Sequence, residues 1–361
     1  MGAVGKFAQA AQGVSPARPE RSSALTRLRV LLIAWVVIYH LELVLQALPG
    51  LPALRQVALK GYLGVDGFFV LSGFALYLGY RHRPPEGLGG WADFVGRRAA
   101  RIFPLHLAAL GMLVALVAGA SLAGLRINEP ERFGLWELAM QVPLLNAWET
   151  TDHHAWNYPS WALSAIWAGY LGFPVLLALM LDTRRATCWV IVAGGFAALA
   201  WLSSLPGASQ LNLSLHLGML RFAFEFILGI ALARLITTRS IGTTFANLSI
   251  GLLPLGVALS IDVVAVAGLA ALVARLGMMV PAEAAPRDLL WRLGEASFGV
   301  YLCWVFVEAA LVLLLRATEA GPGLRLALMA GGFAATLALG WLAWRWVERP
   351  AARLLERRFR T

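Results

Sequence analysis

Residues 187–206, TCWVIVAGGFAALAWLSSLP, contain no charged side chain, and this segment decides what kind of protein the chain forms. A helix needs about 20 apolar residues to cross the roughly 30 Å hydrocarbon layer of a bilayer. The segment has that length and that composition. It predicts a helix that crosses a membrane.

The composition of the whole chain supports the same interpretation. Of its 361 residues, 59% are hydrophobic and only 14% are charged, whereas a soluble domain usually has about 25% charged residues. One water-soluble core of this size cannot hide so much apolar surface. The composition therefore excludes a cytosolic enzyme, a disordered chain and a disulfide scaffold. Cys188 and Cys303 both lie in apolar runs, where we expect them to pack.

Similar apolar runs recur along the chain and predict an all-α, polytopic membrane helix bundle with about ten transmembrane helices. The run Leu135–Trp148 is too short to span and is interpreted as an interfacial or re-entrant piece. The predicted spans lie near residues 28–48, 61–80, 102–124, 161–181, 187–206, 218–237, 241–260, 261–280, 291–315 and 324–344.

The 30 lysines and arginines orient these spans. Most of them fall on the cytoplasmic side if the N-terminus is cytoplasmic, which predicts an N-in, C-in topology. The net charge of +10 is spread over short segments between apolar runs, so we expect no nucleic-acid partner. The predicted divisions are a cytoplasmic N-terminal tail at 1–27, a transmembrane domain at 28–346 and a basic cytoplasmic tail at 347–361. Residues 1–27 lack the apolar core of a signal peptide, so the first span is expected to be an uncleaved anchor.

Titratable side chains inside the predicted spans are costly in lipid and mark candidate functional positions. Arg29 and His40 stand eleven residues apart on the first span, which places them on one helix face about 16 Å apart. Histidine takes and passes a proton near neutral pH, so His40 is the candidate general base. The alternative is that His40 bonds between helices while Arg29 only reaches lipid phosphates.

Asp66 has a similar inferred depth in the second span, where four glycines lie between residues 61 and 73. Small residues let helices approach closely, and a carboxylate beside an imidazole orients it. We therefore expect Asp66 to assist His40. The alternative is that Asp66 caps a helix start and the glycines only pack.

Arg98 and Arg101 stand three residues apart at the start of the third span and share a helix face. Guanidinium groups bind phosphate in a bidentate manner. Together with Arg29 they predict a phosphate-bearing, nucleotide-like ligand at the cytoplasmic edge. Anchoring by positive charge alone is the alternative.

The other charged side chains in the predicted spans are less informative. Arg221 and Glu225, four residues apart in the sixth span, predict an intramembrane ion pair. Glu295 and Glu308 have no obvious partner in the sequence and stay open.

His153 and His154 follow Asp152 in a polar segment. Adjacent histidines give poor ligand geometry without partners elsewhere, so we expect no metal site there. The segment is interpreted as a loop on the acceptor side of the protein.

Five sequence motifs follow one another along the chain. They are Arg29-x10-His40, GVDGFFVLSGF at Gly64–Phe74, Arg98-x-x-Arg101, RFAFEFILG at Arg221–Gly229 and VERP at Val347–Pro350. In this order, over about residues 24–358, the chain resembles acyltransferase family 3. Members of this family are bacterial membrane O-acyltransferases that modify surface carbohydrates.

The resemblance implies transfer of an acyl group, usually acetyl from cytoplasmic acetyl-CoA, to a carbohydrate hydroxyl at or beyond the outer face. It implies that His40 is the catalytic histidine, which we expect Asp66 to orient. It also implies that Arg29, Arg98 and Arg101 bind the donor or support the site. The expected location is the bacterial inner membrane, with lipid around the bundle and acyl-CoA as donor substrate rather than as a permanently bound cofactor. Four residues are expected on the acceptor side: Trp161, Ser164, Arg221 and Glu225.

Two positions depart from the family pattern. Ile166 stands where the family usually has a glutamate after W-S-L-S-x, and Trp304 stands where a histidine often follows Y-L-x. The lost carboxylate leaves three interpretations besides an ordinary enzyme: weak activity, a different acceptor or a catalytically silent homologue.

A transporter or flippase for a lipid-linked sugar is the alternative from another functional class, because buried charges and about ten spans suit it as well. Under the enzyme hypothesis, the acceptor hydroxyl attacks the thioester carbonyl with His40 as general base. Aromatic side chains stack on the sugar, with Trp148, Trp156, Tyr158 and Trp161 as the candidates.

Overall fold

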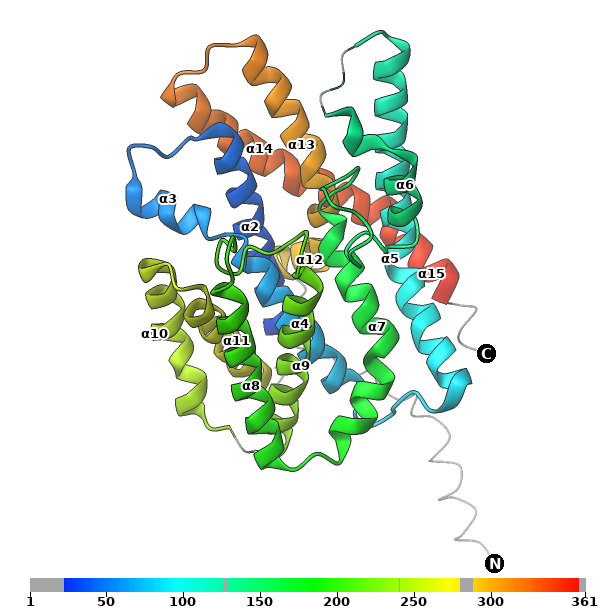
Figure 1. Ribbon diagram of the computed structural model, residues 1–361, viewed down its shortest axis with the longest axis vertical. Helices are drawn as coiled ribbons and strands as arrows, with labels where there is room; N and C mark the ends of the chain where they lie inside the picture. Colours follow the sequence, from blue (N-terminus) through cyan, green and yellow to red (C-terminus); the bar gives the residue numbers. More distant parts are fainter. Residues whose placement is uncertain (1–22, 126, 128, 240, 280–287, 357–361) are drawn as a thin grey trace, which may run out of the picture.

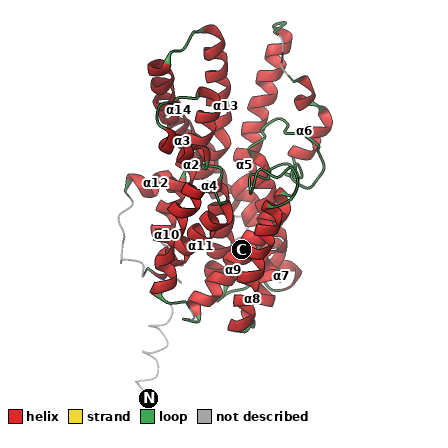
Figure 2. Ribbon diagram, turned by 60° about the vertical axis from the view of Figure 1, so that its left-hand side comes forward, coloured by secondary structure: helices red, strands yellow, loops and turns green. Residues whose placement is uncertain are grey.

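The computed structural model describes residues 23–125, 127, 129–239, 241–279 and 288–356. Every regular element in these ranges is helical (Figure 2). The predicted N-terminal tail, residues 1–27, lies outside the described residues up to residue 22, and residues 23–27 already belong to the first helix.

Within the described ranges, ten longer helices form the body of the molecule (Figure 1). They are α2 (Ser23–Leu45), α4 (Leu63–Tyr80), α5 (Gly87–Leu122), α7 (Ser160–Leu181), α8 (Arg185–Ser203), α9 (Gly218–Thr237), α10 (Thr243–Leu259), α11 (Asp262–Met278), α13 (Ser297–Ala317) and α14 (Pro322–Ala343). The shorter elements are α3 (Pro52–Leu59), η1 (Pro130–Phe133), α6 (Leu135–Gln141), α12 (Leu289–Glu295), η2 (Trp344–Glu348) and α15 (Arg349–Glu356).

Each predicted span corresponds to one of the ten longer helices, but among the described residues seven segments are long and apolar enough to cross a membrane. These are α2, α4, α5, α7, α8, α13 and the continuous stretch from α14 into α15. The other three longer helices are too charged or too short to be counted with these seven. The helix α9 carries Arg221, Glu225 and Arg234, and α10 and α11 have only 17 residues each. The chain is thus an all-helical membrane protein, and the count of ten spans and the N-in, C-in topology stay predictions.

Several helices begin, break or end at other residues than the predicted spans and divisions. The third span was expected at 102–124, but α5 begins at Gly87, so Arg98 and Arg101 lie within a continuous helix. The predicted span 291–315 is broken at Ala296 between α12 and α13. The predicted tail from 347 continues through the π-helical turn η2 into α15, which packs on α5.

The segment Leu135–Trp148 is helical only over α6 and then turns. Its position is fixed by α5, because His106 Nε2 lies 2.8 Å from the carbonyl oxygen of Gln141. Gln141 in turn donates from its side chain to the carbonyl of Ala155, at 2.6 Å. The short α6 therefore holds the loop that leads into α7.

The α4–α9 pair forms one of the closest helix contacts. A Cβ atom added at Gly73 would lie 2.0 Å from the carbonyl oxygen of Phe226, and one at Gly229 would lie 2.1 Å from that of Val70. Real atoms do not approach so closely, so both positions require glycine and the two backbones touch. This contact brings Asp66 on α4 and Arg221 on α9 together.

Candidate active site

A cavity of about 280 Å³ lies among α2, α4, α7, α9 and α13, beside two loops. Its wall combines aromatic faces with a few polar groups. The lining residues are Val36, Tyr39, His40, Leu43, Tyr62, Val65, His154, Tyr158, Pro159, Trp161, Asn212, Ser214, Arg221, Tyr301, Trp304 and Glu308.

His40 is held on the wall of this cavity by aromatic neighbours. Its ring stacks on Trp304 with a centroid separation of 3.7 Å and an interplanar angle of 20°. Tyr39 meets it edge-on at 4.8 Å, and its Nδ1 lies 3.4 Å from the hydroxyl of Tyr158. One face and one nitrogen of the imidazole are thus occupied, whereas Nε2 makes no hydrogen bond to any described residue.

The departure at position 304 is therefore part of the site. Where the family often has a histidine, the indole of Trp304 covers the face of His40. An aromatic face attracts a cation by about 0.5–2 kcal/mol. Such a contact favours the imidazolium that forms when His40 takes a proton.

Glu308, which sequence reasoning left open, lines the cavity. Its Oε2 accepts a hydrogen bond from the Tyr158 hydroxyl at 3.3 Å, and the same hydroxyl lies beside His40. Glu308 is the only carboxylate among the described residues that line the cavity. Its place on α13, one helical turn after Trp304, is the signal that was available in the sequence.

Asp66 was expected to assist His40. In the structure it does not contact His40, and both of its carboxylate oxygens face Arg221. Arg221 Nε donates to Asp66 Oδ1 at 2.9 Å, and its Nη2 donates to Oδ2. The predicted pair with Glu225 is present but looser, with 3.7 Å between Arg221 Nε and Glu225 Oε1. Two fully buried carboxyl groups therefore share one guanidinium, and this cluster fixes α4 against α9 beside the cavity.

Of the remaining predicted acceptor-side residues, Trp161 lies at the cavity and Ser164 does not. Trp161 lines the cavity, with the guanidinium carbon of Arg221 5.8 Å from its ring centroid. Ser164 does not line the cavity: its hydroxyl donates to the carbonyl of Leu144 at 2.6 Å and holds the loop before α7. Ile166, the other departure, packs against the apolar core and is also absent from the cavity wall.

The three predicted donor-binding arginines lie in the N-terminal halves of α2 and α5, whereas His40 lies in the C-terminal half of α2. Arg29 is on the same helix as His40 and its Nη1 lies 3.9 Å from Glu295 of α12. Arg98 donates to the Tyr80 hydroxyl at 2.7 Å and lies 5.7 Å from the ring centroid of Tyr170.

Arg101 follows Arg98 on α5 and is half-buried. Arg29 contacts α12, whereas Arg98 contacts Tyr80 of α4 and Tyr170 of α7.

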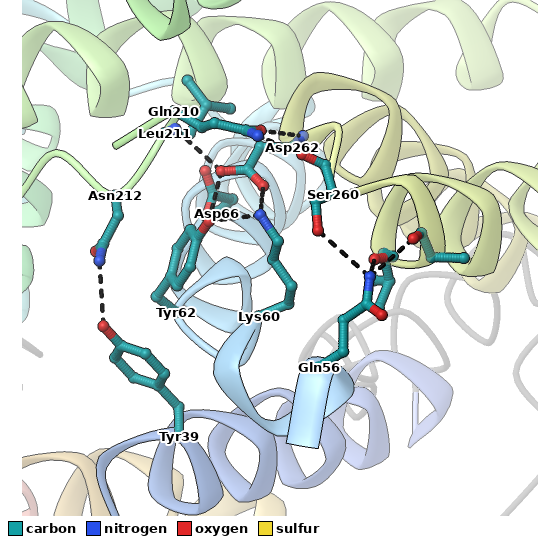
Figure 3. A network of polar contacts seen from close by, with 12 residues as sticks. Tyr39, Gln56, Lys60, Tyr62, Asp66, Gln210, Leu211, Asn212, Ser260 and Asp262 are labelled. Carbon is teal, nitrogen blue, oxygen red and sulfur yellow. Dashed lines mark hydrogen bonds and ion pairs between the residues drawn. The ribbon is translucent and has the colours of Figure 1, made fainter. Parts of the chain in front are cut away.

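A polar network holds the loop between α8 and α9 in place (Figure 3). Asp262, at the start of α11, accepts from Lys60 Nζ at 2.7 Å and from the Tyr62 hydroxyl at 2.6 Å. The same carboxylate accepts from the backbone N–H of Leu211 at 3.0 Å.

Asn212 extends this attachment to α2, because its side-chain nitrogen donates to the hydroxyl of Tyr39 at 3.1 Å. Tyr39, Tyr62 and Asn212 line the cavity themselves, so the network helps to shape its wall.

The histidine pair before α7 has divided roles. His154 lines the cavity with its Nε2 3.1 Å from Ser214 Oγ, and burial lowers the pKa of its imidazole. His153 is more exposed, with 2.5 Å between its Nδ1 and Asp152 Oδ1, and this hydrogen bond raises the pKa of His153. Among the residues the structure describes, no group of three or more His, Cys, Asp or Glu side chains is arranged to hold a metal.

Comparison with known proteins decides the family. The family model described as "Acyltransferase domain" (acyltransferase family 3) matches residues 23–345. The chain belongs to this family. A curated relative, acyltransferase MdmB of Streptomyces mycarofaciens, is 30% identical over 201 residues, which is 52% of this chain and 49% of that protein. The chain thus matches about half the length of this relative. No solved structure matches this chain significantly.

The chain is thus a member of a family whose model is described as an acyltransferase domain, and its long apolar helices indicate a membrane protein. The family match also confirms the resemblance that the five sequence motifs indicated, because the matched residues include four of them completely.

Proposed function

We propose that this protein is an O-acyltransferase that moves an acyl group, with acetyl as the expected case, from acyl-CoA to a carbohydrate hydroxyl. His40 acts as the general base. The observation that carries the proposal is the position of His40 on the wall of an aromatic cavity, with no hydrogen bond from Nε2 to any residue that the structure describes. A general base must have a free lone pair within reach of the hydroxyl it deprotonates.

The cavity wall suits a sugar acceptor. Aromatic faces stack on the apolar faces of sugar rings, and a small number of polar groups orient the hydroxyls. Trp161 and Tyr301 supply such faces, while Asn212 and Ser214 supply hydrogen-bonding groups from the loop before α9. We therefore propose a cell-surface or exported carbohydrate as the acceptor.

The donor enters from the opposite end of the bundle in this proposal. Arg29 lies about 16 Å along α2 from His40, and Arg98 and Arg101 lie on α5. These guanidinium groups bind the phosphates of acyl-CoA, and the long flexible arm of the donor carries the thioester toward His40. In the inner membrane, with the N-terminus cytoplasmic, that end faces the donor and the cavity lies toward the acceptor.

The reaction balances within this arrangement. The acceptor oxygen attacks the thioester carbonyl as its proton passes to His40 Nε2. The C–S bond then breaks, and the leaving thiolate of CoA takes the proton from His40. The new C–O bond is the ester, and His40 returns to its starting state.

The test is acyl transfer from radiolabelled acetyl-CoA in membranes that carry the wild-type chain or a variant. We expect His40→Ala to lose about 100-fold or more of the rate and His82→Ala, an exposed histidine beyond the end of α4, to keep it. Full activity in His40→Ala contradicts the general-base assignment. Movement of unmodified acceptor across the membrane without acylation favours the transporter alternative.

A further inference from the structure

A histidine base needs its second nitrogen fixed, because the proton on Nδ1 decides whether Nε2 presents a lone pair. In serine hydrolases a carboxylate holds Nδ1–H directly. Here the sequence offers Asp66 for that task, but its two oxygens are occupied by Arg221. Position 166, where the family usually has a glutamate, is a half-buried isoleucine that packs against the apolar core. The partner of His40 Nδ1 must therefore be sought elsewhere.

The structure provides a tyrosine in that position. Tyr158 Oη lies 3.4 Å from His40 Nδ1 and 3.3 Å from Glu308 Oε2. A phenol has one proton to donate and an oxygen that accepts. When Tyr158 donates to Glu308, its oxygen is left to accept the Nδ1–H of His40, and Nε2 keeps its lone pair.

Other contacts hold this tyrosine in place. Its ring meets the Trp304 ring edge-on at 5.2 Å, so one indole packs on both His40 and Tyr158. The guanidinium of Arg132 lies 5.7 Å from the Tyr158 ring on the side toward the loops, and the His154 ring lies 5.6 Å away. Tyr158 is thus fixed from several directions at the one point that joins His40 to Glu308.

We propose that Tyr158 and Glu308 form a positioning relay for His40, in which the carboxylate holds the tyrosine hydroxyl and the tyrosine oxygen holds the Nδ1–H of the imidazole. This inference rests on the proposed function. When Nε2 takes the acceptor proton, the resulting imidazolium donates a stronger hydrogen bond to Tyr158, and Glu308 supplies the opposite charge two contacts away. The relay is not consumed, because the proton leaves again from Nε2 to the CoA thiolate. The two long hydrogen bonds are of the kind that tighten when substrates bind.

The experiment compares Tyr158→Phe, Glu308→Gln and the double variant in the acyl-transfer assay, with kcat and KM measured separately. Each single change is expected to lower kcat about 10-fold or more while the KM for acceptor stays within about twofold. Because the two residues act as a unit, the double variant is expected to be no slower than the slower single variant. Glu319→Gln, an exposed glutamate after α13, is the matched control and keeps the wild-type kcat.

The outcomes separate the relay from the function it serves. If the wild type transfers no acyl group, the proposed function fails. If the wild type is active and His40→Ala is not, but Tyr158→Phe keeps the full kcat, the relay alone is overturned. A rise in KM without a fall in kcat shows that Tyr158 only stacks on the sugar, which also overturns it. Tyr158→Phe removes a single oxygen, so it decides the matter even if Glu308→Gln does not fold.

Discussion

The buried cluster of Arg221, Asp66 and Glu225 gives the sharpest prediction about stability. The side chains are almost fully buried, with 1% of Arg221 exposed and 0% of each carboxylate. Arg221→Met removes the guanidinium and leaves two buried carboxyl groups without a cation. Breaking a buried ion pair on one side costs about 3–5 kcal/mol. The total stability of a folded protein is only about 5–15 kcal/mol, so we expect a severe loss of folded protein.

The assay is equilibrium unfolding in mixed detergent micelles, with SDS as denaturant and the free energy of unfolding as the readout. Asp66→Asn is expected to cost less than Arg221→Met, because it removes one of the two carboxylates and leaves Arg221 paired with Glu225. The double variant Arg221→Met/Asp66→Asn is expected to be about 0.5–3 kcal/mol more stable than the sum of the single changes predicts. His82→Ala, at the surface, should stay within about 0.5 kcal/mol of wild type.

The same measurement separates the two roles considered for Asp66. If Asp66→Asn changes the unfolding free energy by less than about 0.5 kcal/mol yet abolishes acyl transfer, then the main role of Asp66 is not to stabilise the buried cluster. The carboxylate would then act on His40, and the assignment of the positioning role to Glu308 would be wrong.

Three further predictions follow from the site. Ile166→Glu places a carboxylate against the apolar core, so it should lower the yield of folded protein and add no activity; a gain in kcat would instead support a silent homologue. Trp304→Ala removes the ring stacked on His40 and should lower kcat roughly 2- to 30-fold, which is the cation–aromatic contribution of about 0.5–2 kcal/mol as a rate; a wild-type kcat contradicts this role. Burial lowers the pKa of His154 from its ordinary 6.5, so the unfolded chain binds the proton first and stability should fall as pH drops below about 6.5, by at most about 1.4 kcal/mol per pH unit. His154→Gln should show a flatter unfolding free energy between pH 6.5 and 5, and equal slopes for both proteins would contradict it.

The helices were predictable because their signals are local. The uncharged run at 187–206 became α8 at Arg185–Ser203, and the spacing from Arg29 to His40 lies on one continuous helix. The predicted spans 241–260 and 261–280 imply a turn where they meet, near residue 260. It lies there, with Ser260 in the left-handed conformation at φ +57°.

The contacts of the site were not predictable because they join distant parts of the chain. Asp66 and Arg221 are 155 residues apart, and Tyr158 and Glu308 are 150 apart. Hydropathy locates each helix but does not fix its rotation about its own axis, and that rotation decides which acidic side chain meets His40. The sequence therefore identified Asp66 as a functional candidate but not its partner.

The limits of motif reasoning are clearest at Ser164 and Trp304. Ser164 lies in a family motif, yet its hydroxyl holds the loop carbonyl of Leu144 instead of facing the cavity. Trp304 was noted only as a departure from the family, yet its ring lies 3.7 Å from that of His40. A motif position shows which residue type is usual, whereas its role depends on the neighbours that packing brings to it.

The central claim is that an acceptor hydroxyl meets His40 Nε2 inside the aromatic cavity. The most direct measurement is an experimental structure of the wild-type protein with a carbohydrate acceptor bound in lipid nanodiscs. We expect a sugar hydroxyl oxygen at about 2.6–3.2 Å from His40 Nε2, with the ring still stacked on Trp304 and Nδ1 toward Tyr158. An acceptor bound outside this cavity, or a His40 ring turned out toward lipid, would contradict the account.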